Sequence, residues 1–116
     1  MDLIRKILLA LEEKEDFEEP IVPEIPGVTT NEIYYHIKLL NEAGLIEAKD
    51  WSTDNGSEWV ATSLTSPGHD FLDAARNETF WVKAKSLVQN SGGALTLEAM
   101  KVALDQVVKS ALQGGS

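Results

Sequence analysis

Apolar side chains recur every three or four residues in several stretches of the chain, and this spacing predicts amphipathic helices. The first helix is expected over residues 2–14 and the last over residues 96–112, with Thr96 as its cap. Between them, Ser66-Pro67 suits the start of another helix. Its apolar positions shift by about half a turn at residues 77–79. We therefore expect a break there, with Asn77 capping a further helix that ends at Gly92-Gly93.

The central stretch, residues 28–46, predicts a helix that turns directly into a strand. Thr29 can cap the helix, and Glu32 completes a capping box. Ile33, Ile37 and Leu40 would line the buried face. Gly44 stands where a left-handed residue would end the helix, so the helix is expected over residues 29–43.

The neighbouring segments predict extended structure. Residues 12–26 are acidic and contain three prolines, Pro20, Pro23 and Pro26, which argues against a regular helix there. Residues 45–51 and 58–64 favour a β-hairpin, and Asn55-Gly56 between them is a strong turn signal. The pattern does not fix the strand register.

These elements together predict an α+β, mainly α fold: a winged helix-turn-helix-like domain with a two-stranded wing and added C-terminal helices. Residues 1–66 would form the winged-helix core. Residues 67–112 would add helices packed on the same domain, and residues 113–116 would be a frayed tail. The proline-rich segment replaces the helix that normally positions the recognition helix across DNA.

Charge is distributed unevenly along the 116 residues. Residues 1–58 hold fourteen acids and five bases, a net charge of −9, whereas residues 59–116 hold five of each. DNA binding relies on phosphate neutralisation by Lys and Arg, so this distribution disfavours DNA as a partner. There is no cysteine, no recognisable signal peptide and no apolar run long enough to span a membrane. We expect a cytoplasmic protein with no membrane association.

The sequence supports no catalytic, cofactor-binding or metal-binding residues. His36 and His69 are the only histidines, and a zinc site would need carboxylates to complete it. We expect His36 to be partly buried and hydrogen-bonded to the backbone. No motif with a chemical mechanism is present, so we predict a protein that is not an enzyme.

Two sets of exposed residues are candidates for binding. Aromatic side chains are enriched at protein-binding hot spots, which favours a protein-interaction surface on the central helix and the first wing strand. Its residues would be Asn31, Tyr34, Tyr35, Lys38, Asn41 and Trp51. If the chain binds DNA instead, the contacts would come from Arg5, Lys6, Lys38 and Lys49.

Three segments resemble the YjcQ-like family of uncharacterised phage, prophage and bacterial proteins. They are MDLIRKILLALEE, EIYYHIKLLNEAGLIEA and SEWVATSLTSPGHDFLDAARNETFW, which together span roughly residues 1–90. The resemblance implies a winged-helix fold and a mobile-element context. It implies no activity and no ligand residues.

The favoured function is therefore a non-enzymatic winged-helix protein of phage or prophage type that acts through protein–protein interaction. One version is an acidic regulator or decoy of a nucleic-acid-binding host protein. The alternative is a dimeric DNA-binding transcriptional regulator that uses the 29–43 helix and the 45–64 wing. The apolar face of residues 96–112 could close the core of the chain or form a homodimer.

Overall fold

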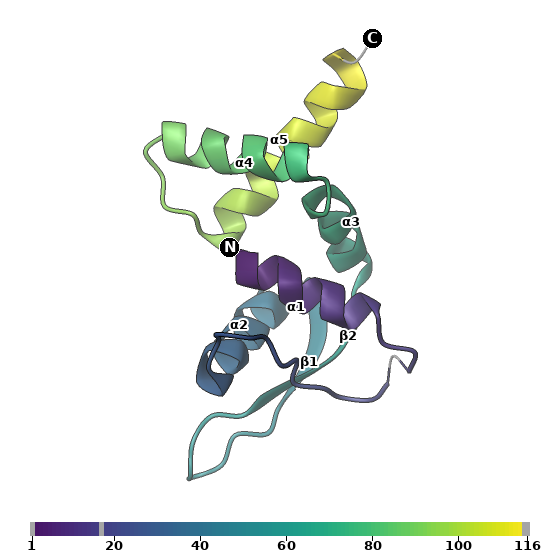
Figure 1. Cartoon of the computed structure of the whole chain (residues 1–116), viewed down its shortest axis with the longest axis vertical. Helices are drawn as coiled ribbons and strands as arrows, with labels where there is room; N and C mark the ends of the chain where they lie inside the picture. The colour runs from purple at the N-terminus through teal and green to yellow at the C-terminus, as the bar shows by residue number, and fades with distance from the viewer. Residues whose placement is uncertain (1, 17, 115–116) are drawn as a thin grey trace. The chain divides into compact units, whose positions relative to one another are not determined.

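The computed structural model describes residues 2–16 and 18–114. Within these residues the chain forms five helices and one two-stranded antiparallel sheet, so the expected mainly helical α+β class is confirmed (Figure 1). The helices are α1 (Asp2–Glu12), α2 (Thr30–Glu42), α3 (Ser66–Ala75), α4 (Glu78–Asn90) and α5 (Leu97–Gly114), and the strands are β1 (Ile46–Asp50) and β2 (Trp59–Leu64).

The chain divides into two compact units, Asp2–His69 and Asp70–Ser116. The division falls three residues after the boundary drawn from the sequence at residue 66. Each unit contains its own set of buried apolar side chains, and the two are described separately below.

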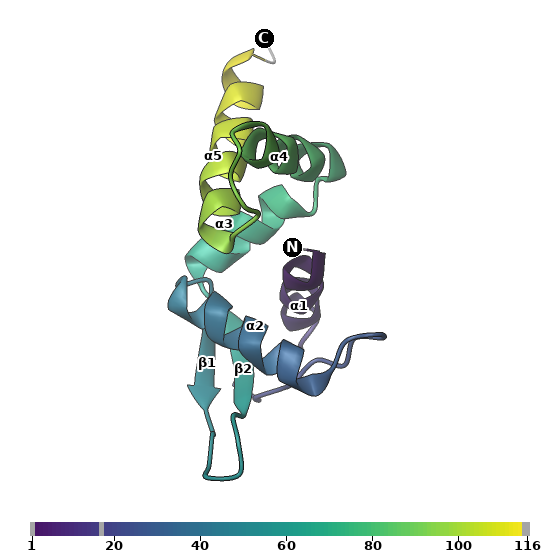
Figure 2. The ribbon, with the colours of Figure 1, turned by 90° about the vertical axis from the view of Figure 1, so that its left-hand side faces the viewer.

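The unit Asp2–His69 is built from α1, α2 and the hairpin. Helix α2 packs against both strands, and α1 packs against β2 and α2. The apolar stripes predicted from the sequence supply the core: Ile4, Ile7, Leu8 and Leu11 from α1, Ile33, Ile37 and Leu40 from α2, and Leu45, Ile46, Val60 and Ala61 from the hairpin. The hairpin extends beyond the strands, and its loop lies at one end of this unit (Figure 2).

The proline-containing segment between α1 and α2 has no helix in its described residues, as expected. Its backbone instead pairs with the hairpin. The N–H and carbonyl groups of Ile21 exchange hydrogen bonds of 2.7 and 2.8 Å with Ala61 of β2, which makes an isolated antiparallel bridge. Lys14 holds the beginning of the segment, because its ammonium group donates to the backbone carbonyls of Glu19 and Thr62.

The hairpin contains an irregularity that explains this contact with Lys14. Glu47 pairs with Ser63 and Ala48 pairs with Ala61, so Thr62 is an extra residue on β2. The carbonyl of such a residue is released from the regular ladder. Lys14 supplies a donor to this carbonyl, and the Thr62 hydroxyl donates to the carbonyl of Glu47 at 3.0 Å.

The unit Asp70–Ser116 contains most of α3 together with α4 and α5, which pack against each other. Trp81 is fully buried, and its ring meets Phe71 edge to face with centroids 6.3 Å apart. The predicted break between helices is confirmed, because the Asn77 side chain accepts from the N–H of Phe80 at 3.1 Å. The remaining buried side chains are Leu72, Ala75, Ala84, Val88, Leu97, Met100, Ala103, Leu104 and Val107.

Three local details differ from the sequence expectation. Thr65, not Ser66, caps α3: its hydroxyl accepts from the N–H of Gly68 at 3.0 Å, and Ser66 is already helical. The hairpin turn places Asp54 and Asn55 at its tip, one residue earlier than expected, because Thr53 and Gly56 pair with each other. Helix α5 extends to Gly114, and the remaining expected tail residues, 115 and 116, lie outside the described residues.

Candidate interaction site

Helix α2 is fixed firmly at both ends, which sets the direction of its outward face. The hydroxyl of Thr29 accepts from the N–H of Glu32 at 3.2 Å, as the capping pattern predicts. At the other end, Gly44 adopts a φ of 78°, and its carbonyl accepts from the Thr65 hydroxyl at 2.7 Å. With Ile33 and Ile37 buried, the opposite side of the helix faces solvent.

The base of the hairpin loop is held by a small hydrogen-bond network. The carboxylate of Asp50 accepts from the N–H of Ser52 at 2.9 Å, and the Ser52 hydroxyl oxygen accepts from the N–H of Glu58 at 3.0 Å. The N–H of Trp51 donates to the carbonyl of Glu58 at 2.8 Å. These bonds order the loop residues that approach α2.

The outward face of α2 and the hairpin loop together line an open groove of about 540 Å³, here called the α2–wing groove. Polar and aromatic side chains from both elements face this space, and the Tyr35 side chain is 54% exposed. The lining residues are Asn31, Tyr34, Tyr35 and Lys38 from α2, and Thr53, Asn55, Gly56, Ser57, Glu58 and Trp59 from the hairpin.

Four of the six predicted interaction residues are therefore brought together in this groove. Of the other two, Asn41 is half-buried and Trp51 is 48% exposed, and neither lines the groove. Tyr34 is half-buried instead of fully exposed, and Trp59 of the hairpin is also half-buried. The hairpin side of the groove was not anticipated, because it depends on how the loop folds toward α2.

His36 supports the exposed ring of Tyr35. The two rings meet edge to face, with centroids 5.5 Å apart and planes at 82°. His36 is half-buried, and its Nδ1 lies 2.7 Å from the carbonyl oxygen of Glu32, which confirms the expected backbone partner. An aromatic ring that is already held in place by a neighbour loses less conformational entropy when a partner binds. Tyr35 is therefore well suited to contact a partner.

The positive charge of the groove comes from Lys38, and its effect is offset locally. Hydrogen bonds from the side chain and backbone of Ser52 lower the pKa of Asp50, and the nearby Lys38 ammonium lowers it further. Asp50 thus stays ionised beside Lys38. Glu58 adds a second carboxylate to the lining.

The four candidate DNA-contact residues differ in exposure. Lys6, Lys38 and Lys49 are exposed, whereas the Arg5 side chain is only 20% exposed and lies 4.0 Å from Asp2. Only Lys38 of these four lines the α2–wing groove. The tip of the hairpin loop carries Asp54.

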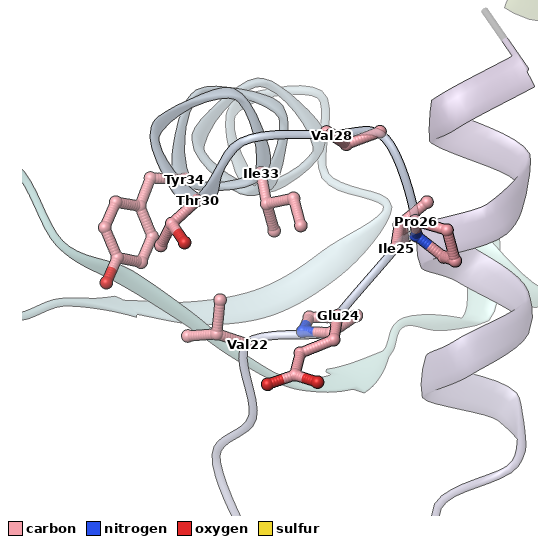
Figure 3. A pocket seen from close by; sticks show the side chains of 9 residues that line it. Val22, Glu24, Ile25, Pro26, Val28, Thr30, Ile33 and Tyr34 are labelled. Atoms are coloured by element: carbon pink, nitrogen blue, oxygen red, sulfur yellow. The ribbon is translucent and has the colours of Figure 1, made fainter.

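A second hollow of about 600 Å³ lies beside the first turn of α2, between it and the proline-containing segment. Figure 3 shows Thr30 and Ile33 of α2 and Val22 of the segment pointing toward one another across it. Tyr34 lines both this hollow and the α2–wing groove. The other lining residues are Pro23, Glu24, Ile25, Pro26 and Val28.

Within residues 2–16 and 18–114, no cluster of three or more metal-ligating side chains could hold a metal ion. None of the helices formed by these residues is long and apolar enough to cross a membrane.

Comparison with known proteins places the chain in a family. A family described as hypothetical proteins, DUF2513, matches residues 1–94. The chain belongs to this family. A relative within the same size range, an uncharacterised protein of Haemophilus influenzae (strain ATCC 51907 / DSM 11121 / KW20 / Rd), is 38% identical over 112 residues, which cover 96% of this chain and 95% of that protein. No solved structure matches the chain significantly.

The DUF2513 match covers both the unit Asp2–His69 and helices α3 and α4 of the following unit. It supports the expected membership of an uncharacterised family. The YjcQ-like name and the phage origin have no support from the DUF2513 match or from the Haemophilus relative.

Proposed function

We propose that this DUF2513 protein is a non-enzymatic winged-helix protein that binds another protein through the α2–wing groove. The order of elements supports the winged-helix assignment: a helix, an extended segment bridged to the sheet at Ile21, a second helix and a hairpin. In DNA-binding winged-helix proteins, the helix that corresponds to α2 enters the major groove of DNA. Here the same face forms an aromatic groove against the hairpin loop.

The observation that carries the proposal is the chemistry of this groove. Tyr34, Tyr35 and Trp59 supply aromatic surface, and the positive charge of Lys38 is offset by Asp50 and Glu58. Aromatic side chains with polar neighbours are typical of protein-binding surfaces. DNA-binding surfaces instead depend on several Lys or Arg side chains whose positive charge is not offset by nearby carboxylates.

The charge of the surrounding unit indicates the class of partner. Residues 2–69 hold fourteen acids and five bases, so a partner with a basic surface would be attracted and oriented by this field. Nucleic-acid-binding proteins have such surfaces. The protein would then act in the cytoplasm as an acidic regulator or decoy of a nucleic-acid-binding host protein. The phage or prophage context is part of this proposal and derives from the YjcQ-like resemblance.

Site-specific photo-crosslinking tests the proposal directly. A benzophenone amino acid is placed at Tyr35 in the groove, or at Val82, which is 52% exposed on α4 and serves as the matched control. We expect cells that express the two variants to yield a basic protein crosslinked from position 35 and not from position 82. Tyr34→Ser should weaken this crosslink. The same crosslinked proteins from both positions would contradict the proposal.

A second candidate is a dimeric DNA-binding regulator, favoured by the winged-helix order of elements and by the exposure of Lys6, Lys38 and Lys49. Titration with a labelled mixed-sequence duplex at ~50 mM salt distinguishes the two, because low salt favours phosphate contacts. Under our proposal, DNA does not bind at micromolar protein. Micromolar, salt-sensitive binding that Lys38→Glu abolishes would support the DNA-binding function instead.

A further inference from the structure

Helices α4 and α5 leave apolar side chains uncovered on their outer surface. A groove of about 430 Å³ runs between the two helices. Leu87 of α4 and Val102 of α5 line it and are 42% and 59% exposed, and Leu112 near the end of α5 is 80% exposed. The other lining residues are the apolar Val88, Ala99 and Ala103, the polar Ser91, Glu98 and Gln106, and Gly93.

The charged side chains beside this groove follow an ordered pattern along α5. Glu98, Lys101, Asp105 and Lys109 alternate in sign, and their helical spacing of three and four residues places them on one side of the helix. Two ion pairs within the helix use them: Lys101 lies 3.8 Å from Glu98, and Lys109 lies 2.9 Å from Asp105.

This sequence of charges is complementary to itself when it is reversed. If a second α5 lies antiparallel with the two-fold axis near Ala103, Glu98 faces the partner's Lys109 and Lys101 faces the partner's Asp105. Each acid then meets a base along the whole contact. A parallel arrangement would instead bring identical charges together, which is unfavourable.

We propose that the outer face of α4 and α5 is a homodimer interface in which two α5 helices pack antiparallel. The two copies of Val102 meet near the two-fold axis, with Leu87 beside them. In this register Leu112 lies opposite the residues that directly precede the partner's α5. Residues 70–116 hold five acids and five bases, so this part of the chain, unlike the acidic unit Asp2–His69, creates no net repulsion between the copies.

Equilibrium sedimentation with charge-exchange variants tests the proposal. Over about 1–200 µM, a range that resolves micromolar Kd values, we expect the wild-type protein to shift from monomer to dimer. Lys109→Glu should raise the dimer Kd at least about fivefold, because it creates two symmetric repulsions with the partner's Glu98. Lys49→Glu, at an exposed position of the unit Asp2–His69, changes the net charge equally and serves as the control.

The double variant E98K/K109E is the decisive measurement. It restores opposite charges across the antiparallel interface, while it places like charges at both ion pairs within each helix. A return of the Kd to within about twofold of the wild-type value can therefore come only from contacts between the two chains. Glu98 and Lys109 are 74% and 67% exposed, so these exchanges leave the core of the unit unchanged.

Two outcomes would overturn the proposal. If the wild-type protein stays monomeric over the whole concentration range, the α4–α5 face is not a homodimer interface and is available to a different protein. A double variant that dimerises as weakly as Lys109→Glu would rule out the antiparallel register.

Discussion

The two compact units of this chain present different surfaces to a partner. The unit Asp2–His69 carries the whole excess of negative charge and an aromatic groove between α2 and the hairpin loop. The unit Asp70–Ser116 has balanced charges and exposed aliphatic side chains along α4 and α5. A strong field of one sign attracts an oppositely charged partner, whereas a neutral, self-complementary surface permits association between copies. This difference is the reason why we propose a different kind of partner for each unit.

The largest effect is expected at the start of α3, where a backbone carbonyl lies close to Gly68. A Cβ atom on Gly68 would lie 1.9 Å from the carbonyl oxygen of Leu45. That carbonyl already accepts from the N–H of Thr65 at 3.0 Å and has little freedom to move. We expect Gly68→Ala to reduce the free energy of unfolding by about 3 kcal/mol.

Gly93→Ala in the other unit is the matched control for Gly68→Ala. A Cβ atom there would meet its nearest neighbour, the carbonyl oxygen of Val88, at an ordinary 3.5 Å. Chemical denaturation should show a change below about 0.5 kcal/mol for this variant. Equal losses in the two variants would mean that the backbone approach at Leu45 does not limit residue size at position 68.

A smaller effect is expected at the bulge in β2, which helps to place the hairpin. Thr62→Val keeps the shape of the side chain but removes the hydroxyl that donates to Glu47. Because the Glu47 carbonyl then loses its partner in a part-buried hydrogen bond, we expect the free energy of unfolding to fall by about 1 kcal/mol in chemical denaturation. Thr79→Val, at an exposed position of α4, should change stability by less than about 0.5 kcal/mol. A similar loss in both variants would mean that replacing threonine by valine lowers stability whether or not the hydroxyl makes this hydrogen bond.

The sequence predicted the features that depend on residues close together along the chain. Thr29 and Asn77 were identified as caps because a side-chain oxygen three residues before a free N–H is sufficient for the bond. Gly44 and Gly92 were placed at helix ends for a similarly local reason, and both have positive φ values.

Features set by distant contacts could not be predicted in the same way. The bulge at Thr62 is supported by Lys14, which lies 48 residues earlier. The turn at Asp54-Asn55 replaces the expected Asn55-Gly56 turn, since the pairing of Thr53 with Gly56 sets the loop ends. For the same reason only the α2 half of the groove was anticipated: periodicity identifies an outward face but not the loop that lies against it.

The difference in charge between the units leads to a prediction about salt. Repulsion among fourteen acids should destabilise the unit Asp2–His69 at low ionic strength, and salt should screen it. From ~10 to ~200 mM NaCl, we expect amide exchange in α1 and α2 to slow about two- to fivefold, with a smaller change in α4 and α5. Equal slowing in all four helices would show that charge does not distinguish the units.

The smallest expected effect concerns Asp50, which lies beside the groove and is held by Ser52. The pKa of Asp50 is lower in the folded than in the unfolded protein. Its hydrogen bonds to Ser52 therefore stabilise the folded protein at pH values above the unfolded pKa, and this stabilisation is lost as the pH falls through the folded pKa. Carboxyl NMR titration should show that Ser52→Ala raises this pKa more than Lys38→Met does, since the Ser52 side-chain hydrogen bond is the larger cause. If Lys38→Met had the larger effect, attraction to the Lys38 ammonium would be the main cause of the lowered pKa of Asp50. Lys38 would then be less available to a negatively charged partner than the exposed Lys49 is.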